Sequence, residues 1–248
     1  MALRVPASEL EVAAAWLIEH FPAGFEERGA GGSSELAVFT DTAGEAAVRA
    51  AFADVSSDPV PPGWEDRWKE FHRPVRAGGL WIGPPWADPP AGEEVVVVDP
   101  GRAFGTGAHP TTRACIELLA RLDRGSVLDA GCGSGVVSVA AARLGFEPVL
   151  AVDLDEVAVE VALETVRANG VDVSVSHADV LYDDLPAVDV VVANIELAIV
   201  EELLRRVPGG VAVTSGYLAV DAPGAAGWLV VERLELEGWA ADVLAKRH

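Results

Sequence analysis

The residues best placed to do chemistry are a run of glycines and an aspartate near the middle of the chain. Gly131, Gly133 and Gly135 directly follow one apolar run, and Asp153 ends the next. A strand that ends in a glycine turn lets the backbone approach a ligand closely, because no Cβ stands in the way. A carboxylate about 20 residues further on, at the end of the second strand, can accept hydrogen bonds from ribose hydroxyls. This pattern predicts a binding site for a nucleoside-containing cofactor.

Two residues near the glycines indicate which cofactor the site would bind. Position 136 is Val, whereas the dinucleotide fingerprint has a glycine there that lets the helix pack under a pyrophosphate. Asp129 adds a carboxylate two positions before the first glycine. Together these features favour S-adenosylmethionine over NAD. Asp153 could instead cap the following helix, but Asp155 lies directly before that helix and suits the capping role better.

A third polar side chain, Asn194, ends the apolar run 188–193, which we expect to form a strand next to the first. Its amide oxygen could face a reacting amine or the methionine end of the cofactor, so Asn194 is the candidate catalytic residue. The alternative is a turn-forming Asn, which is common at strand ends. Asp179 either receives the adenine amino group or is an ordinary loop aspartate. His109, followed by Pro110, is expected to order a loop rather than to act as a base.

Helical and strand patterns alternate from about residue 113 onward. We predict helices at 113–122, 136–144, 156–169 and 197–207, and strands at 127–130, 148–152, 173–176, 188–193, 211–215, 228–236 and 241–244. This order predicts an α/β fold with a doubly wound, mostly parallel, Rossmann-like sheet. Ligands bind such a sheet at the carboxyl ends of its strands, which is where the glycine turn, Asp153 and Asn194 fall.

The preceding part of the chain has a different organisation. Residues 1–60 are predicted to form a small α+β domain, in the order strand, helix, strand, strand, helix, strand of a ferredoxin-like fold. Residues 61–76 are predicted to be a helical linker, in which Trp64, Trp68 and Phe71 form an aromatic stripe typical of a packing seam. Residues 77–248 would then be the domain that holds the sheet, with additional strands at 80–82 and 95–98.

Composition limits the classes of function. The chain has 248 residues, half of them hydrophobic, and only two cysteines, which gives no disulfide framework and no metal-ligand spacing. No segment approaches the roughly 20 apolar residues that a membrane helix needs. Glu9 and Glu11 interrupt the region where a signal peptide would be apolar. We therefore expect a cytoplasmic protein with no membrane partner and no bound metal.

The net charge of −21 argues against direct binding to DNA or RNA, which relies on Lys and Arg to displace counterions. Residues 1–60 alone carry ten acidic and three basic side chains. Such charge permits attraction to a basic protein partner. A plainer explanation, that the charge only keeps the protein soluble or suits a salt-adapted host, stays open.

Four segments together resemble the ribosomal protein L-eleven methyltransferases (PrmA family), which are class I S-adenosylmethionine-dependent enzymes. The segments are Phe104-Gly-Thr-Gly-Ala-His-Pro-Thr-Thr112, Asp129-Ala-Gly-Cys-Gly-Ser-Gly135, Val152-Asp153 and Val192-Ala-Asn-Ile195. The first is far more specific than the glycine turn, which all class I methyltransferases share. The resemblance extends from about Trp64 to the end. Before that, only the order of elements matches the family's small substrate-recognition domain.

This resemblance implies that S-adenosylmethionine binds at Thr112, Gly131, Asp153 and Asn194, and at Gly133 in the same glycine turn as Gly131. It also implies that Phe104 and its loop cover the cofactor. The implied activity is methylation of lysine ε-amines and of the α-amine on one large-subunit ribosomal protein. The chain departs from the family at Glu196, where a small or hydrophobic run is usual, so a charge there could alter substrate access.

Other functions remain open at this point. One is a class I methyltransferase that acts on a different protein or on a small-molecule amine. Another is a non-catalytic module that binds a nucleotide and scaffolds a partner, and a more distant one is a dehydrogenase. The set Phe104, Thr112, Asp153 and Asn194 argues against the scaffold, since a site without function would be free to lose such residues.

Overall fold

A computed structural model of the chain divides into two compact units, Met1–Asp66 and Arg67–His248. It describes residues 2–6, 13–14, 16–17, 20–21, 26–30, 33–38, 40, 42–52, 54–57, 72–100, 105, 107–208 and 210–247. The aromatic stripe predicted at Trp64, Trp68 and Phe71 lies outside the described residues. The predicted helical linker is wrong at its end, since residues 72–74 are not helical and residues 75–77 form a strand. The other predicted domain boundaries stay a prediction, and each unit is described by itself.

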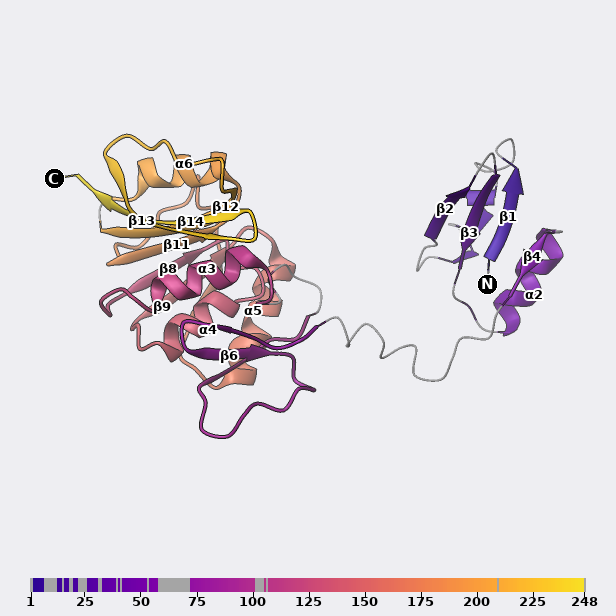
Figure 1. Cartoon of the computed structure of the whole chain (residues 1–248), viewed down its shortest axis with the longest axis horizontal. Coiled ribbons are helices and arrows are strands. Elements are labelled where there is room, and N and C mark those ends of the chain that lie inside the picture. Colours follow the sequence, from indigo (N-terminus) through magenta and orange to yellow (C-terminus); the bar gives the residue numbers. More distant parts are fainter. Residues whose placement is uncertain are drawn as a thin grey trace. The chain divides into compact units, whose positions relative to one another are not determined.

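The first unit contains an antiparallel four-stranded sheet in the order β2-β3-β1-β4 (Figure 1). Its elements are β1 (Ala2–Pro6), β2 (Glu26–Ala30), β3 (Ser33–Ala37), α2 (Thr42–Ala51) and β4 (Val55–Ser56). Residues 13–14, 16–17 and 20, between β1 and β2, are helical. This is the element order and strand order of a ferredoxin-like fold, as expected. The sequence did not locate β2, because Glu-Glu-Arg-Gly-Ala has no alternation of apolar and polar residues.

The second unit is built on a seven-stranded sheet in the order β10-β9-β8-β11-β12-β14-β13. Its strands are β8 (Val127–Ala130), β9 (Val149–Asp153), β10 (Ser174–His177), β11 (Val190–Asn194), β12 (Val211–Leu218), β13 (Trp228–Leu236) and β14 (Trp239–Lys246). The first five of these run parallel, and β14 and β13 close the sheet in antiparallel fashion. The predicted fold class, a doubly wound and mostly parallel Rossmann-like sheet, is confirmed.

Helices cover both faces of this sheet, as its strands require. The helices are α3 (Pro110–Leu119), α4 (Val136–Arg143), α5 (Glu156–Asn169) and α6 (Leu197–Arg206). In Figure 1, α3, α4 and α5 lie on one side of the strands and α6 on the other. Side chains alternate between the two resulting cores, so that Val127 packs with the α3–α5 layer and Leu128 with α6. Among the described residues, no helix is long and apolar enough to cross a membrane.

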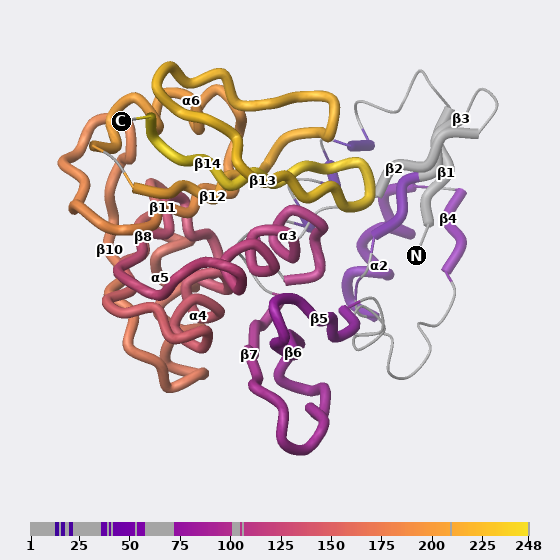
Figure 2. The backbone as a smooth tube through the Cα atoms, turned by 60° about the vertical axis from the view of Figure 1, so that its left-hand side comes forward, coloured from indigo at the N-terminus to yellow at the C-terminus, as the bar shows by residue number. Residues whose placement is uncertain are grey.

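A separate three-stranded sheet packs beside α4 and α5, visible as its own layer in Figure 2. Its strands are β5 (Val75–Ala77), β6 (Leu80–Gly83) and β7 (Val95–Val97). Asn169, the last residue of α5, accepts a hydrogen bond from the Val97 amide at 2.8 Å and donates one to the Val97 carbonyl at 2.7 Å. This side chain fastens β7 to the C-terminal end of α5.

Two boundaries near the predicted site differ from the sequence prediction. Helix α3 begins at Pro110 rather than at residue 113, because His109 acts as its N-cap and proline suits the first turn. Strand β12 continues to Leu218, three residues beyond the predicted end, after a bulge between Ser215 and Tyr217. Both changes extend an element towards the carboxyl edge of the parallel strands.

Candidate active site

The predicted site residues meet at the carboxyl edge of β8 and β11, where the strand order of the sheet reverses. A hollow opens there between the glycine turn, the start of α3 and the end of β11. Its lining residues are Gly105, Thr112, Asp129, Gly131, Cys132, Gly133, Val136, Val137 and Asn194. Four predicted site residues, Thr112, Gly131, Gly133 and Asn194, are therefore brought together. Asp153 joins them through a hydrogen bond to the turn.

The glycine turn between β8 and α4 forms one wall of the hollow. Gly131 and Gly133 adopt φ angles of 79° and 53°, in the left-handed region. A Cβ on Gly131 would lie 2.5 Å from Cγ2 of Ile195, so any side chain here would collide with the residue that follows Asn194. The amides of Gly131 and Cys132 both donate to the Val152 carbonyl, at 2.9 and 3.0 Å. These bonds fix the turn against the end of β9.

Asp153 ends β9 and is half-buried. One carboxylate oxygen accepts the Gly133 amide at 2.8 Å, and the other accepts the Asp155 amide at 3.0 Å. A carboxylate has about four lone-pair sites, so each oxygen can accept a further hydrogen bond. Asp155 is the N-cap of α5 and accepts the Val157 amide at 2.9 Å, as expected from the sequence. The helix cap is thus provided without Asp153.

Thr112 and Asn194 face each other across the hollow although 82 positions separate them. Asn194 Nδ2 donates to Thr112 Oγ1 at 3.3 Å. Thr112 is buried in the first turn of α3, and Asn194 is half-buried at the end of β11, opposite Ser215 on β12. With Nδ2 bound to Thr112, the side-chain oxygen of Asn194 is the atom that can accept a hydrogen bond from a ligand.

Asp129 is a charged group inside the site whose partner was not predicted. It is 3% exposed and accepts the Ser138 hydroxyl at 2.5 Å. The pKa of Asp129 is raised to about 6: burial raises it most, the Ser138 hydrogen bond lowers it, and the nearby Asp153 carboxylate raises it. Asp129 and Val127 point to the same face of β8 because strand side chains alternate, so α4 supplies the partner. A serine inside a helix gives no sequence signal for such a role.

Ser134 is a second residue beside the hollow whose contact the sequence did not reveal. Its hydroxyl donates to the Gly105 carbonyl at 2.5 Å, and so ties the glycine turn to the segment before α3. Phe104, which the sequence predicts to cover the cofactor, lies outside the described residues. Gly105, its neighbour, lines the hollow.

The two other candidates for reactive groups have structural roles. His109 caps α3: its Nδ1 accepts the Thr111 amide at 3.4 Å and lies 2.7 Å from Thr111 Oγ1. Burial lowers the pKa of His109, and its ring meets that of Trp239 edge to face at 5.0 Å. Burial raises the pKa of the Cys132 thiol, which keeps this thiol protonated. Neither side chain is arranged as a nucleophile or a base.

The electrostatic character of the hollow limits what it can bind. Two carboxylates, Asp129 and Asp153, lie in or beside it, and none of its described lining residues is Lys or Arg. A phosphate group would lack a cationic side chain there, whereas a ligand with positive charge and sugar hydroxyls would find acceptors for both. Within the described part of the chain, no group of three His, Cys, Asp or Glu side chains could hold a metal ion.

Comparison with known proteins gives one consistent result. The family described as "Ribosomal protein L11 methyltransferase (PrmA)" matches residues 47–247. The ribosomal protein L11 methyltransferase of Exiguobacterium sibiricum is 39% identical over 203 residues, which cover 75% of this chain and 64% of that relative. The enzyme of the same name from Desulforamulus reducens is 43% identical over 171 residues, or 64% of this chain and 56% of that relative. The chain thus spans less than two thirds of either relative.

A solved structure agrees with the sequence relatives. The crystal structure of a ribosomal protein L11 methylase from Lactobacillus delbrueckii subsp. bulgaricus matches with a TM-score of 0.65 and 26% sequence identity. The match covers 71% of this chain and all of that chain.

Proposed function

Because the chain belongs to the ribosomal protein L11 methyltransferase family, we propose that it methylates amino groups of ribosomal protein L11 with S-adenosylmethionine as methyl donor. The amino groups are lysine ε-amines and the N-terminal α-amine, and the enzyme meets its substrate in the cytoplasm. One observation carries this proposal: a single hollow collects the glycine turn, Thr112 and Asn194 beside two carboxylates.

The residues of the hollow fit S-adenosylmethionine. The glycine turn has no Cβ that would keep a ligand away from its backbone, and Asp129 and Asp153 match a ligand with a positive charge and a ribose. When bound, S-adenosylmethionine supplies a methyl group that its positively charged sulfur activates for transfer. Asp153 would hold the ribose hydroxyls with its remaining lone pairs, while the amide of Gly133 keeps the carboxylate in place.

Asn194 is the residue that would orient the substrate amine. Its Nδ2 is held by Thr112, which directs the side-chain oxygen to accept an N–H of the incoming amine. Such positioning aligns the nitrogen lone pair with the methyl group, and correct alignment accounts for much of the rate in a displacement of this kind. Thr112 thereby acts on the chemistry through Asn194.

The amine must lose its proton before it can react. A lysine ammonium has a pKa near 10.4 in water, and removal from water lowers that value. The site offers a largely apolar wall in Val136 and Val137 and can exclude water once the substrate covers it. We infer that desolvation on docking favours the neutral amine, and that bulk water takes the proton before the substrate covers the site.

The first unit is the candidate for recognising the protein substrate. Residues 1–60 carry ten acidic and three basic side chains, a charge that attracts a basic protein. We expect residues 67–248 alone to retain cofactor affinity, since that unit is compact by itself, but to lose methylation of the protein substrate. Calorimetry with S-adenosylhomocysteine and a methylation assay on the same sample measure the two effects. Full activity of residues 67–248 on the protein would contradict this division of labour.

The whole proposal is tested with purified components. Ribosomal protein L11, a second basic ribosomal protein and a set of small amines are each incubated with the enzyme and unlabelled S-adenosylmethionine. We expect mass increments of 14 Da or its multiples, the mass of a CH₂ group, on L11 alone. Methylation of another substrate in preference to L11 would replace the substrate in this proposal. Cofactor binding with no transfer to any substrate would favour the non-catalytic scaffold, and binding of NAD in place of S-adenosylmethionine would favour a dehydrogenase.

A further inference from the structure

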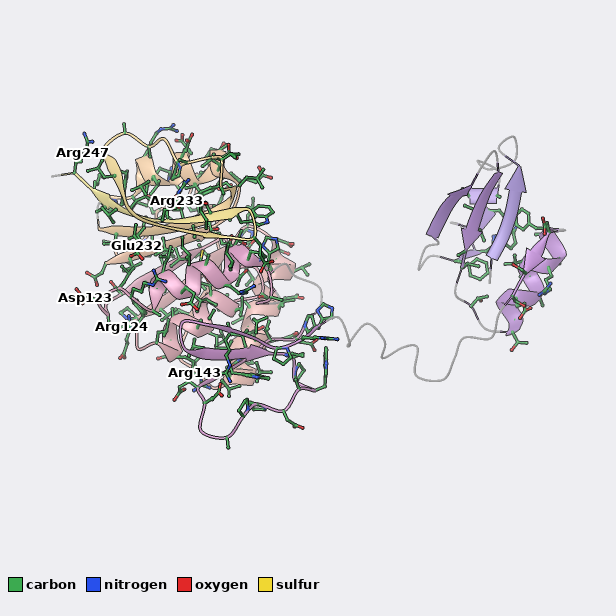
Figure 3. All side chains as sticks on the ribbon, in the orientation of Figure 1. Asp123, Arg124, Arg143, Glu232, Arg233 and Arg247 are labelled. Carbon is green, nitrogen blue, oxygen red and sulfur yellow. The ribbon has the colours of Figure 1, made fainter. Side chains whose placement is uncertain are left out.

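The second unit contains an ion pair with a buried carboxylate and a partly exposed arginine, which the proposed chemistry does not use. Asp242 on β14 is fully buried and accepts two bonds from the Arg233 guanidinium on β13, to Nε and Nη2, both at 2.8 Å. It also accepts the Tyr217 hydroxyl at 2.9 Å. Figure 3 labels Arg233 among the strands drawn in yellow. An ion pair removed from water is often no more stabilising than apolar side chains of the same size. We therefore ask which part of the chain Arg233 and Asp242 hold in place.

Arg233 positions the segment that follows β12. Its guanidinium donates to the Ala219 carbonyl at 3.2 Å and to the Asp221 carbonyl at 2.8 Å. The Ala219 amide also donates to the Gly238 carbonyl at 2.9 Å. Residues 218–221, which we call the ledge, are thus held by main-chain and side-chain bonds. The buried carboxylate of Asp242 in turn fixes the arginine.

The ledge lies next to the candidate active site. Ser215 on β12 is paired with Asn194 on β11, so Leu218 lies about 10 Å further along β12, beyond the carboxyl end of β11. The contact between the strands is close: a Cβ on Gly216 would lie 2.1 Å from the Ile195 carbonyl oxygen, and only glycine fits at its φ of 103°. Leu218 is also paired with Trp239, whose ring meets the cap of α3.

The ledge exposes two apolar side chains although hydrogen bonds hold its backbone in place. Val220 is 89% exposed and Leu218 is 48% exposed. Three exposed acidic side chains belong to the ledge or to segments that contact it or β12. Asp221 is in the ledge itself, and Glu237, which is bound to Arg113, precedes Gly238, whose carbonyl accepts the Ala219 amide. Glu196 follows Ile195, whose carbonyl lies against Gly216 of β12. An apolar pair with an acidic rim matches a partner that is basic and has apolar side chains.

We propose that the ledge is a docking surface for the basic polypeptide segment that carries the methylated amine. This inference rests on the proposed function, because it supplies that reaction with its substrate contact on the catalytic unit. A second copy of the chain is a poor occupant, since its own net charge of −21 would be repelled by the acidic rim. A nucleic acid is excluded by the same repulsion.

The first test replaces both apolar side chains, in the double variant Leu218→Ser/Val220→Ser of the full chain. Both side chains are exposed, so folding is little affected, and neither belongs to the binding or catalytic residues. The matched control is Val231→Ser, since Val231 is 61% exposed on the edge strand β13. We expect the KM for purified ribosomal protein L11 to rise about tenfold in the double variant, with kcat and cofactor affinity unchanged. The same KM in the double variant and in the control would overturn the proposal.

The second test does not depend on turnover. A photoreactive amino acid is placed at position 220, or at position 231 as control, and irradiated with purified ribosomal protein L11. Cross-linking from 220 but not from 231 supports the ledge, and equal yields or none from 220 overturn it. If L11 is cross-linked at 220 but not methylated by the wild-type enzyme, the proposed function fails while the ledge stands. If L11 is methylated but neither test responds, the ledge fails alone.

Discussion

Ser138 on α4 donates its hydroxyl to the carboxylate of Asp129 on β8 at 2.5 Å, and both side chains are buried. The pair lies where the sheet meets the layer of helices, directly under the glycine turn. A buried carboxylate is difficult to ionise, so ionised Asp129 lowers the stability of the folded protein. The same negative charge can stabilise a positively charged ligand in the hollow.

Asp129→Asn should make the protein without cofactor more stable above pH 6. The folded pKa of Asp129 is raised to about 6 from an ordinary 3.8. A raised carboxyl pKa contributes stability that is complete below pH 3.8 and is lost as the pH rises through 6. The wild type should therefore lose about 3 kcal/mol from this group between pH 4 and pH 7, and the variant should not.

Urea unfolding at pH 4.5 and pH 8 measures this effect, with the difference between variant and wild type largest at pH 8. Asp189→Asn is the control of opposite sign. Hydrogen bonds from Ser126 lower the pKa of Asp189 below its ordinary 3.8, so the stability that they contribute is complete above that pH and is lost only as the pH falls below it. This variant should therefore be less stable than wild type by a similar amount at pH 4.5 and at pH 8. An Asp129→Asn variant less stable than wild type at pH 8 would show that the ionised carboxylate does not destabilise the folded protein.

Asp153→Ala should weaken the binding of S-adenosylmethionine by about 100-fold, because two hydrogen bonds from ribose hydroxyls to a charged acceptor are lost. Titration calorimetry with S-adenosylmethionine or S-adenosylhomocysteine measures the change. Asp155→Ala is the matched control: it removes a neighbouring carboxylate that caps α5, and should lower stability by about 1 kcal/mol while leaving cofactor affinity intact. Equal affinities in the wild type and Asp153→Ala would refute the role given to Asp153.

Asn194→Ala should lower kcat for the protein substrate by about 100-fold, since the reacting amine loses the oxygen that aligns it. Thr112→Val keeps the shape of the side chain but removes the partner of Asn194 Nδ2, so its effect should have the same direction and a smaller size. Single-turnover kinetics separate this loss from weaker cofactor binding. Unchanged single-turnover rates in Asn194→Ala would remove it from the chemistry.

Arg233→Met should destabilise the protein by about 3 kcal/mol, because it leaves the carboxylate of Asp242 buried without its cation. Arg233→Met/Asp242→Leu removes both charges and should recover most of that stability. The ledge would still lack the two bonds to its carbonyls, so we expect the KM for ribosomal protein L11 to stay raised in the double variant. A normal KM together with restored stability would mean that the ion pair is not needed to hold the ledge.

Much of the second unit could be predicted from the sequence because its patterns are local. The strand at 127–130, the helix at 156–169 and its Gly170 stop were predicted with the bounds that the structure shows. Elements with weak patterns were not found. Strand β5 (Val75–Ala77) is only three residues long, and the start of α3 was placed too late because His109 is an uncommon cap.

The sequence predicted which residues belong to the candidate site, but not which of them contact one another. The sequence indicates the glycine turn, Asp153 and Asn194, because each ends a strand. It does not show that Thr112 bonds Asn194, since that contact depends on how α3 packs against β11, 82 positions away. Ser138 was missed for the same reason: a helical serine is ordinary until β8 places a carboxylate beside it.

Asn169 joins the three-stranded sheet of the second unit to α5, a helix that packs on the larger sheet. Its amide group bonds both main-chain atoms of Val97, as a neighbouring strand would, and also donates to the Thr165 carbonyl at 2.8 Å. The outer strand β7 cannot detach without breaking the C-terminal turn of α5. On heating, the three-stranded sheet should therefore melt together with the larger one, and the amide of Val97 should exchange with deuterium as slowly as amides at the end of α5.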